Sequence, residues 1–108
     1  MDNLTTVLDA ISHPSRRAIL DRLSRGPARV TEIAEPFDMS LNAVSKHLKV
    51  LEGAGLIRRD IQGREHFIEF RGEPLRAVSK WVHHYEQFWS RHLDHLEAHF
   101  KAKRKRKP

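Results

Sequence analysis

The side chains with the clearest capacity for chemistry lie near the middle of the chain, where polar and cationic residues interrupt an apolar repeat: Ser40, Asn42, Ser45, Lys46 and Lys49. An asparagine amide can bond adenine through two atoms, and a lysine ammonium donates to the acceptor atoms of guanine. We therefore predict that Asn42, Ser45 and Lys46 face base edges of double-stranded DNA. Ser40 and Lys49 are predicted to lie near the phosphates.

A helix is needed to hold these side chains on one surface, and residues 40–54 have the pattern of a helix. Their apolar residues recur at spacings of three and four: Leu41, Val44, Leu48 and Leu51. Such a repeat predicts one buried stripe, and Leu41 is expected to be buried with the others. Ser40 is a typical N-cap, and Gly53 or Gly55 suits the left-handed residue that ends a helix.

The flanking segments extend this helix into a larger motif. Residues 30–39 predict a short helix that is broken by Pro36. Residues 57–70 predict two short strands around a turn at Gln62 and Gly63. A short helix, a turn, a longer helix and a hairpin follow one another in a winged helix-turn-helix.

The tip of the predicted hairpin carries a second set of candidate DNA contacts. Gln62 and Arg64 flank the turn glycine. Arginine suits the narrow, electronegative minor groove, so we predict that this tip contacts the minor groove or the phosphates. Arg58 and Arg59 are further candidates for backbone contacts, weakened by the neighbouring Asp60.

The run from His13 to Phe70, and above all its segment VSKHLKVLEGAGLI, resembles the ArsR/SmtB-type bacterial transcriptional regulators. The resemblance covers about Leu4 to Phe100. It implies a homodimeric repressor that binds a palindromic operator, with the first and last helices forming the dimer interface. It also implies that the positions of Leu41 and Asn42 read bases, where a Gln or Ser often stands. No effector is indicated.

Two helices are predicted before this motif. The first has a regular apolar stripe: Leu4, Val7, Leu8 and Ile11. Pro14 suits the first turn of the second helix, with Ser12 or His13 as its cap. Arginines of the second helix are expected to form a solvated face: Arg16, Arg17, Arg22 and Arg25. The expected fold is thus mainly α with a β-hairpin wing, in the order α-α-α-α-β-β-α.

A last helix is predicted from residues 72–74 to about Lys101, and its apolar face is long and aromatic. A domain of this size has little core left to cover such a face, so part of it is expected to pack on the winged helix and the remainder on a second copy. The residues expected in the homodimer interface are Leu4, Val7, Leu8, Trp81, Tyr85, Phe88, Trp89, Leu93 and Leu96.

The formal net charge of +6 comes from the end of the chain. Residues 101–108 hold six of the twenty Lys and Arg residues and no acid, so residues 1–100 carry fourteen basic against fourteen acidic residues. We predict one domain, residues 1–100, and a basic, disordered tail, residues 101–108. The tail is either a solvated end or an arm that attracts phosphates regardless of sequence.

The eight histidines raise the alternative of a metal-responsive repressor. Three of them share one face of the last helix: His92, His95 and His99. Imidazole suits zinc, nickel and cobalt. One site type of the resembled family on this helix uses Asp-x-His followed by His-x-x-Glu or His, but Val82 and Ala98 stand at the positions that this pattern requires. We predict no metal ligand and no cofactor.

Other functions find less support in the sequence. The chain has no cysteine, no phosphate-binding loop and no Ser-His-Asp arrangement, so we do not predict an enzyme. It shows no signal peptide and no membrane span, which predicts a cytoplasmic location without a membrane partner. A protein-interaction module remains an alternative, in which the polar face of residues 40–54 reads no DNA.

Overall fold

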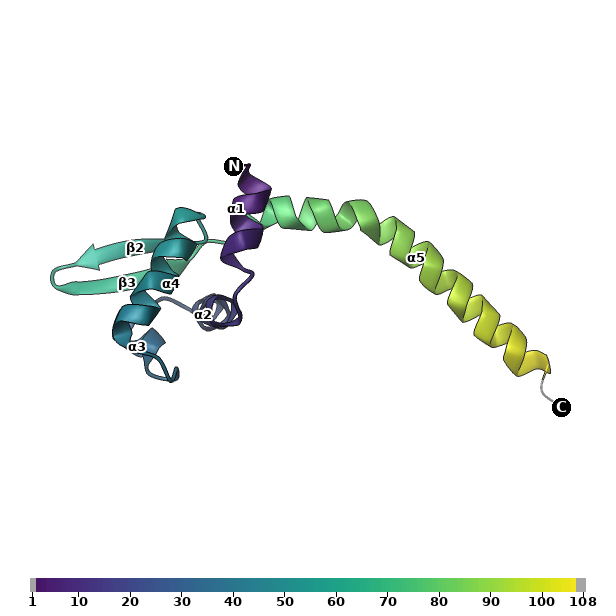
Figure 1. The fold of residues 1–108 in the computed structure, drawn as a ribbon, viewed down its shortest axis with the longest axis horizontal. Helices are drawn as coiled ribbons and strands as arrows, with labels where there is room; N and C mark the ends of the chain where they lie inside the picture. Colours follow the sequence, from purple (N-terminus) through teal and green to yellow (C-terminus); the bar gives the residue numbers. More distant parts are fainter. Residues whose placement is uncertain (1, 107–108) are drawn as a thin grey trace. The chain divides into compact units, whose positions relative to one another are not determined.

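A computed structural model describes the backbone of residues 2–106 and the side chains of residues 2–101. The chain forms two compact units, Met1–Val78 and Ser79–Pro108. Its elements are α1 (Asn3–Ala10), α2 (Pro14–Ser24), β1 (Ala28–Arg29), α3 (Val30–Ala34), α4 (Leu41–Gly53), β2 (Ile57–Gln62), β3 (Glu65–Phe70) and α5 (Leu75–Arg106) (Figure 1). The predicted winged helix-turn-helix, mainly α with a β-hairpin, is confirmed.

The wing is part of a small antiparallel sheet in the order β1-β3-β2. Strands β2 and β3 pair from Ile57 opposite Phe70 to Gln62 opposite Glu65. The turn therefore consists of Gly63 and Arg64, one residue later than predicted. Gly63 has a φ of 64°, and a glycine in the first turn position supplies this conformation without steric cost. The two-residue strand β1 pairs with β3 and was not predicted, because two residues show no periodicity.

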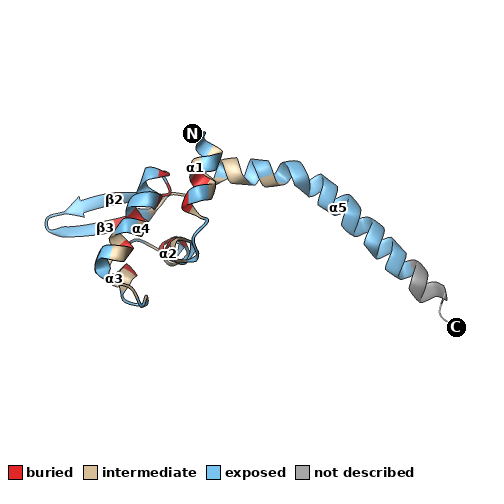
Figure 2. Ribbon diagram, in the orientation of Figure 1, coloured by how far each residue is buried: buried red, intermediate tan, exposed pale blue. Residues whose placement is uncertain are grey.

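One hydrophobic core holds helices α1 to α4 and the sheet together (Figure 2). Its largest fully buried side chains are Val7, Ile19, Leu23, Ile33, Val44, Leu48, Leu51, Leu56 and Ile68. Leu75 and Val78, in the first turn of α5, pack against this core. Because α4 contributes Val44, Leu48 and Leu51 to the core, the opposite side of α4 is left to solvent.

Helix α4 begins and ends as predicted, with one difference in its stripe. Ser40 is the N-cap, and Gly55 takes the left-handed conformation just after the helix, with a φ of 74°. Leu41 is 51% exposed, so the expectation that it would be buried is wrong. Leu41 is the first residue of the helix and lies one turn before Val44, the first buried residue of the stripe.

Helix α5 continues to Arg106, beyond the predicted end at about Lys101. The backbone of residues 101–106 is thus helical where an irregular tail was expected, and residues 107–108 lie outside the described residues. A separate role for residues 101–108 stays a prediction. Within residues 2–106, no helix combines the length and the apolar character that crossing a membrane requires.

Candidate nucleic-acid interface

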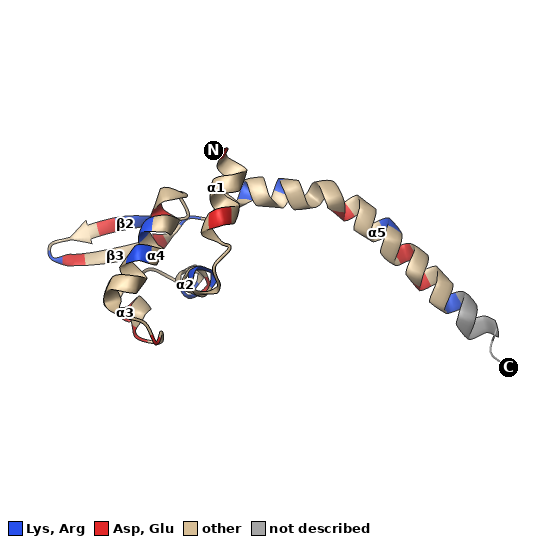
Figure 3. Cartoon of the chain, viewed as in Figure 1, with Lys and Arg blue, Asp and Glu red and all other residues tan. Residues whose placement is uncertain are grey.

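The side chains predicted to read DNA lie on the solvent side of α4. Asn42, Lys46 and Lys49 are exposed and Ser45 is half-buried. Figure 3 shows the basic residues of α4 on this helix, which follows α3 in the helix-turn-helix. Amide, hydroxyl and ammonium groups are therefore available together on one exposed helical surface. These are the donor and acceptor groups that recognise base edges in a major groove.

Ser40 has a structural role that is compatible with a contact to DNA. Its Oγ accepts a hydrogen bond from the backbone N–H of Ala43 at 3.1 Å, which satisfies a donor that the first turn of α4 would otherwise leave unpaired. The hydroxyl proton of Ser40 is not used in this bond and can still be donated. A phosphate oxygen near the helix start is a suitable acceptor.

The wing tip presents Gln62 and Arg64 to solvent. The Nε2 atom of Gln62 donates to Oδ2 of Asp60 at 3.0 Å, which holds the amide along the strand. Arg59 is partly engaged, because its Nε lies 3.8 Å from a carboxylate oxygen of Glu52 and its Nη1 lies 3.3 Å from Nδ1 of His66. Arg58 is the more exposed of the two arginines predicted to contact the DNA backbone.

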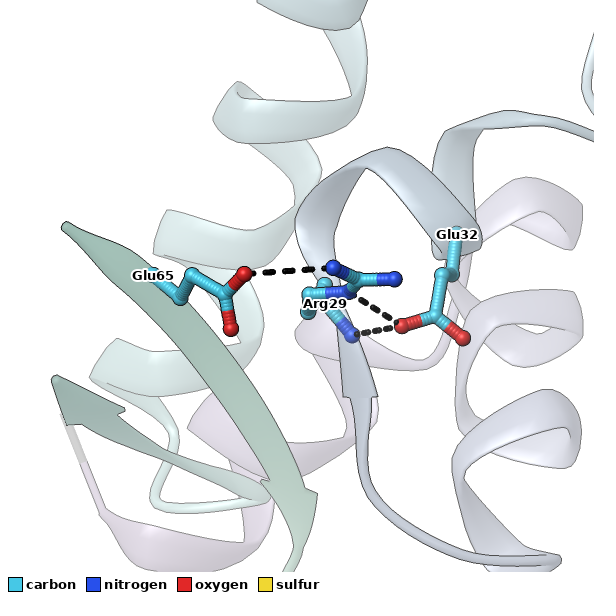
Figure 4. A network of polar contacts seen from close by, with 3 residues as sticks. All are labelled: Arg29, Glu32 and Glu65. Carbon is cyan, nitrogen blue, oxygen red and sulfur yellow. Dashed lines mark hydrogen bonds and ion pairs between the residues drawn. The ribbon is translucent and has the colours of Figure 1, made fainter. Parts of the chain in front are cut away.

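Arg29 joins the start of α3 to the wing, a link that was not predicted (Figure 4). Its Nε donates to Oε1 of Glu32 at 2.8 Å, and its Nη1 donates to Oε1 of Glu65 at 3.2 Å. The Glu32 carboxylate also accepts from the Arg29 backbone N–H at 3.2 Å. Exposed ion pairs are individually weak, and this one links the start of α3 to the first residue of β3, next to the turn of the wing. The hydrogen bonds to Glu32 raise the pKa of Arg29, and those from Arg29 lower the pKa of Glu32.

Two arginines of α2 bind the end of α1 instead of forming only a solvated face. Arg16 Nε donates to the Ala10 carbonyl at 2.6 Å and Arg16 Nη2 to the Asp9 carbonyl at 3.1 Å. Arg17 Nη1 donates to the Ile11 carbonyl at 2.7 Å. The last carbonyls of a helix lack partners within it, and a nearby cation satisfies them. Arg16 is half-buried, so the expectation of a solvated face is wrong for it, whereas Arg17 is exposed as expected and also binds a carbonyl.

Two histidines lie in contact between α2 and α4. His13 is the N-cap of α2, where its Nδ1 accepts from the Ser15 N–H at 3.1 Å. The His13 and His47 rings lie with centroids 4.7 Å apart, and Arg16 Nη1 lies 3.4 Å from His47 Nδ1. Burial, followed by repulsion from His13 and Arg16, lowers the pKa of His47 below 6.5. The neutral form of His47 is therefore the form that fits this cluster.

Replacing His47 by glutamine is expected to flatten the fall in stability on acidification. Because the pKa of His47 is lowered in the folded state, the unfolded chain binds this proton at a higher pH. The contribution of neutral His47 to the stability of the fold is thus fully present above the ordinary histidine pKa. It is lost as the pH falls through the lowered pKa of His47 in the folded state. Urea unfolding at about pH 8 and about pH 5 measures this difference. The exposed His95→Gln serves as the control, and equal losses in wild type and His47→Gln would contradict the assignment.

The histidines of the last helix gain no support as a metal site from the described residues. His92, His95 and His99 are exposed. No group of three or more His, Cys, Asp or Glu side chains that could hold a metal ion occurs within the part of the chain that is described. The imidazole of His83 bonds Glu86 at 2.9 Å, and the His92 ring stacks on Phe88. The metal-responsive alternative is not favoured.

The residues predicted at the dimer interface differ in their exposure. The six on α5 are exposed by 40% to 67%: Trp81, Tyr85, Phe88, Trp89, Leu93 and Leu96. Leu4 and Leu8 are half-buried. Val7 has no exposed surface, because it faces the core of its own winged helix, and we remove it from the predicted interface.

Comparison with known proteins places this architecture in a family. A family model described as a helix-turn-helix domain matches residues 11–60. The transcriptional regulator NmtR of Mycobacterium tuberculosis is 43% identical over 61 residues, which span 56% of this chain and about half, 51%, of that protein. The regulator Rv2034 of the same organism is 36% identical over 78% of this chain and 76% of its own length. The transcriptional repressor SdpR of Bacillus subtilis is 33% identical over 73% of this chain and 88% of its own length.

Solved structures agree in fold as well as in sequence. The crystal structure of an ArsR family transcriptional regulator, RHA00566, is 43% identical, has a TM-score of 0.75 and covers 82% of this chain and 91% of its own. The solution structure of the homodimeric winged helix-turn-helix DNA-binding domain Mb0332 from Mycobacterium bovis is 28% identical, has a TM-score of 0.65 and covers 87% and 84% of the two chains. The protein therefore belongs to the ArsR family of transcriptional regulators.

Proposed function

We propose that this DNA-binding transcriptional regulator is a homodimeric repressor that recognises an inverted-repeat operator through residues 40–54 and the wing, residues 57–70. The observation that carries the proposal is the polar side of α4, where Asn42 and Lys46 are exposed to solvent beside the half-buried Ser45. The core holds the opposite side of this helix, so the polar side can enter a major groove without disturbing the fold.

Each polar residue has a distinct part in this proposal. Asn42 bonds an adenine edge, Lys46 donates to guanine, and Ser45 bonds a neighbouring base. Two further residues, Ser40 and Lys49, hold the phosphates on either side of the groove. At the wing, Arg64 and Gln62 contact the minor groove or its phosphates. Arg29 links the start of α3 to this hairpin through its hydrogen bonds to Glu32 and Glu65.

A second copy of the chain covers the exposed apolar face of α5 in this proposal. The aromatic side chains of Trp81, Tyr85, Phe88, Trp89 and Phe100 are 44% to 67% exposed, and an exposed apolar face of this kind costs free energy in water. The related Mb0332 domain is a homodimer. The interface consists of Leu4, Leu8, Trp81, Tyr85, Phe88, Trp89, Leu93 and Leu96. Dimerisation supplies the second reading helix that specific affinity requires.

Repression follows from occupancy, because a dimer that covers a promoter excludes the transcription machinery. The related SdpR is a transcriptional repressor. We propose a cytoplasmic location for this action. Release of the dimer from DNA requires a change in the angle between the winged helices of the two protomers, or a fall in the concentration of the protein.

Selection of bound sequences from random DNA tests the proposal, carried out with and without zinc and nickel. We expect an inverted repeat whose half-sites are centred about one helical turn apart, roughly 10 base pairs. We also expect the same sequences with and without metal. Enrichment of no sequence would overturn the proposal, and enrichment only with metal would favour the metal-responsive alternative.

Deleting residues 101–108 is expected to weaken the salt dependence of DNA binding more than the sequence preference. These residues hold six of the twenty Lys and Arg residues. Each phosphate contact that they make releases counterions, so the slope of log affinity against log salt should shrink by about 0.9 per lost contact. Titration of operator and unrelated DNA at several salt concentrations measures this slope. An unchanged slope would show that these residues do not act as an arm.

A further inference from the structure

Leu41 is an exposed apolar side chain at the start of the reading helix. It is 51% exposed, whereas the next three residues of the stripe, Val44, Leu48 and Leu51, have no exposed surface. The core of the winged helix therefore leaves Leu41 available, although leucine is among the residues most often buried.

The position of Leu41 on the helix places it at the edge of the proposed reading face. Asn42 follows it directly, and Ser45 lies one turn later on the same side, because residues four apart are neighbours on a helix surface. Its sequence neighbours Ser40 and Asn42 are exposed and polar. Val50, the other exposed apolar residue of α4 at 44%, stands nine residues later and thus on the opposite side of the helix.

The major groove offers one apolar group to a side chain in this position. Each thymine carries a C5-methyl group there, next to the N6 and N7 atoms that its adenine partner presents. Asparagine bonds those adenine atoms, and an aliphatic side chain packs against the methyl group. An adjacent Leu and Asn therefore match the two chemical features of A·T pairs in a major groove.

We propose that Leu41 contacts the methyl group of one thymine in each half-site and so determines sequence specificity at that position. This proposal rests on the DNA reading assigned to α4 above, and it adds an apolar contact to the polar ones. The contact removes the thymine methyl group and part of the exposed surface of Leu41 from water. This burial of apolar surface makes the contact favourable.

Replacing thymine by uracil in the DNA tests this contact, because uracil lacks only the methyl group. In a selected operator, each symmetry-related pair of thymines is changed in turn to deoxyuridine, and the affinity of the wild-type protein is measured. Burial of one methyl group changes an equilibrium roughly fourfold, so changing both half-sites should weaken binding by about 15-fold at one thymine position. At the other thymines little change is expected.

Variants of the protein assign the effect to Leu41. Leu41→Ala should bind the thymine and uracil operators equally, whereas Val50→Ala should keep the wild-type preference for thymine. Asn42→Ala should lose the preference for the adenine that Asn42 bonds but keep its sensitivity to the thymine methyl group. Circular dichroism melts establish that each variant is folded.

The outcomes separate this proposal from the function on which it rests. A wild-type protein that selects an inverted repeat but binds all uracil operators as tightly as the thymine operator would overturn the role of Leu41 alone. A methyl effect that persists in Leu41→Ala would also overturn it. Failure of the wild-type protein to prefer any sequence would overturn the DNA-reading function itself.

Discussion

Changing Asn42, Ser45 and Lys46 together to alanine is expected to abolish discrimination between the operator and unrelated DNA. Specific binding by such proteins exceeds non-specific binding by roughly 10³-fold or more, and each good base contact contributes a substantial share of that ratio. We therefore expect operator affinity to fall at least about 100-fold, towards the affinity for unrelated DNA. Fluorescence anisotropy with operator and scrambled duplexes measures both affinities.

The thermal melt of this triple variant should change little, because none of the three residues belongs to the core. A matched control replaces Ser79 and Lys80 by alanine, since these are exposed residues of two of the same types on another helix. That control should keep operator discrimination. Unaltered sequence preference in the triple variant would end the assignment of α4 as the reading helix and favour a protein-interaction module.

Placing two carboxylates on the aromatic face of α5, through Trp89→Glu and Leu96→Glu, is expected to convert the dimer into a monomer. These positions are seven residues apart, so they lie on the same side of the helix, near the middle of the apolar face. Burying a carboxylate against an apolar partner is strongly unfavourable unless it is paired. Light scattering at micromolar concentration should give the mass of a dimer for wild type and of a monomer for the variant.

Operator affinity should fall with the loss of the dimer, because one winged helix contacts only one half-site. Gln87→Glu is the control, since Gln87 lies on the opposite side of α5 from Trp89 and Leu96. It adds the same kind of charge and should leave the mass and affinity unchanged. A monomeric mass for the wild-type protein would contradict the proposed interface.

The helices and the hairpin of this protein could be predicted from its sequence because they follow local rules. Apolar residues at helical spacing outlined α4, and a serine and a glycine marked its two ends. Pro14 marked the first turn of α2, and His13, which caps this helix, was one of the two predicted cap residues. In each case the physical cause acts within a few residues, so it is visible in the sequence.

Features that depend on contacts distant in sequence were not predictable in the same way. The pairing of β1 with β3 and the Arg29–Glu65 bond join residues separated by more than thirty positions. Nor does periodicity indicate where the core ends, which is why Leu41 was assigned to it. It also does not distinguish a residue facing its own core from one facing a partner, and Val7 proved to belong to its own core.

In the candidate site, too, features with a local cause could be predicted and features that depend on distant contacts could not. The exposure of Asn42, Lys46 and Lys49 follows from the apolar pattern that buries their neighbours, and that of Arg64 from its place in the turn of the hairpin. The functions of Arg16 and Arg17 do not, because an arginine on a helix surface looks alike in sequence with or without a carbonyl to bind. A sequence therefore indicates which side chains are free to read DNA better than which cations stabilise the fold.

Chemical protection of guanine N7 atoms on a selected operator tests the central claim most directly, since those atoms are accessible only in the major groove. If α4 of each protomer enters a major groove, the bound protein should protect guanines in two patches centred about one helical turn apart, roughly 10 base pairs, on one face of the duplex. Guanines that stay fully reactive under saturating protein, or protection confined to a single patch, would contradict it.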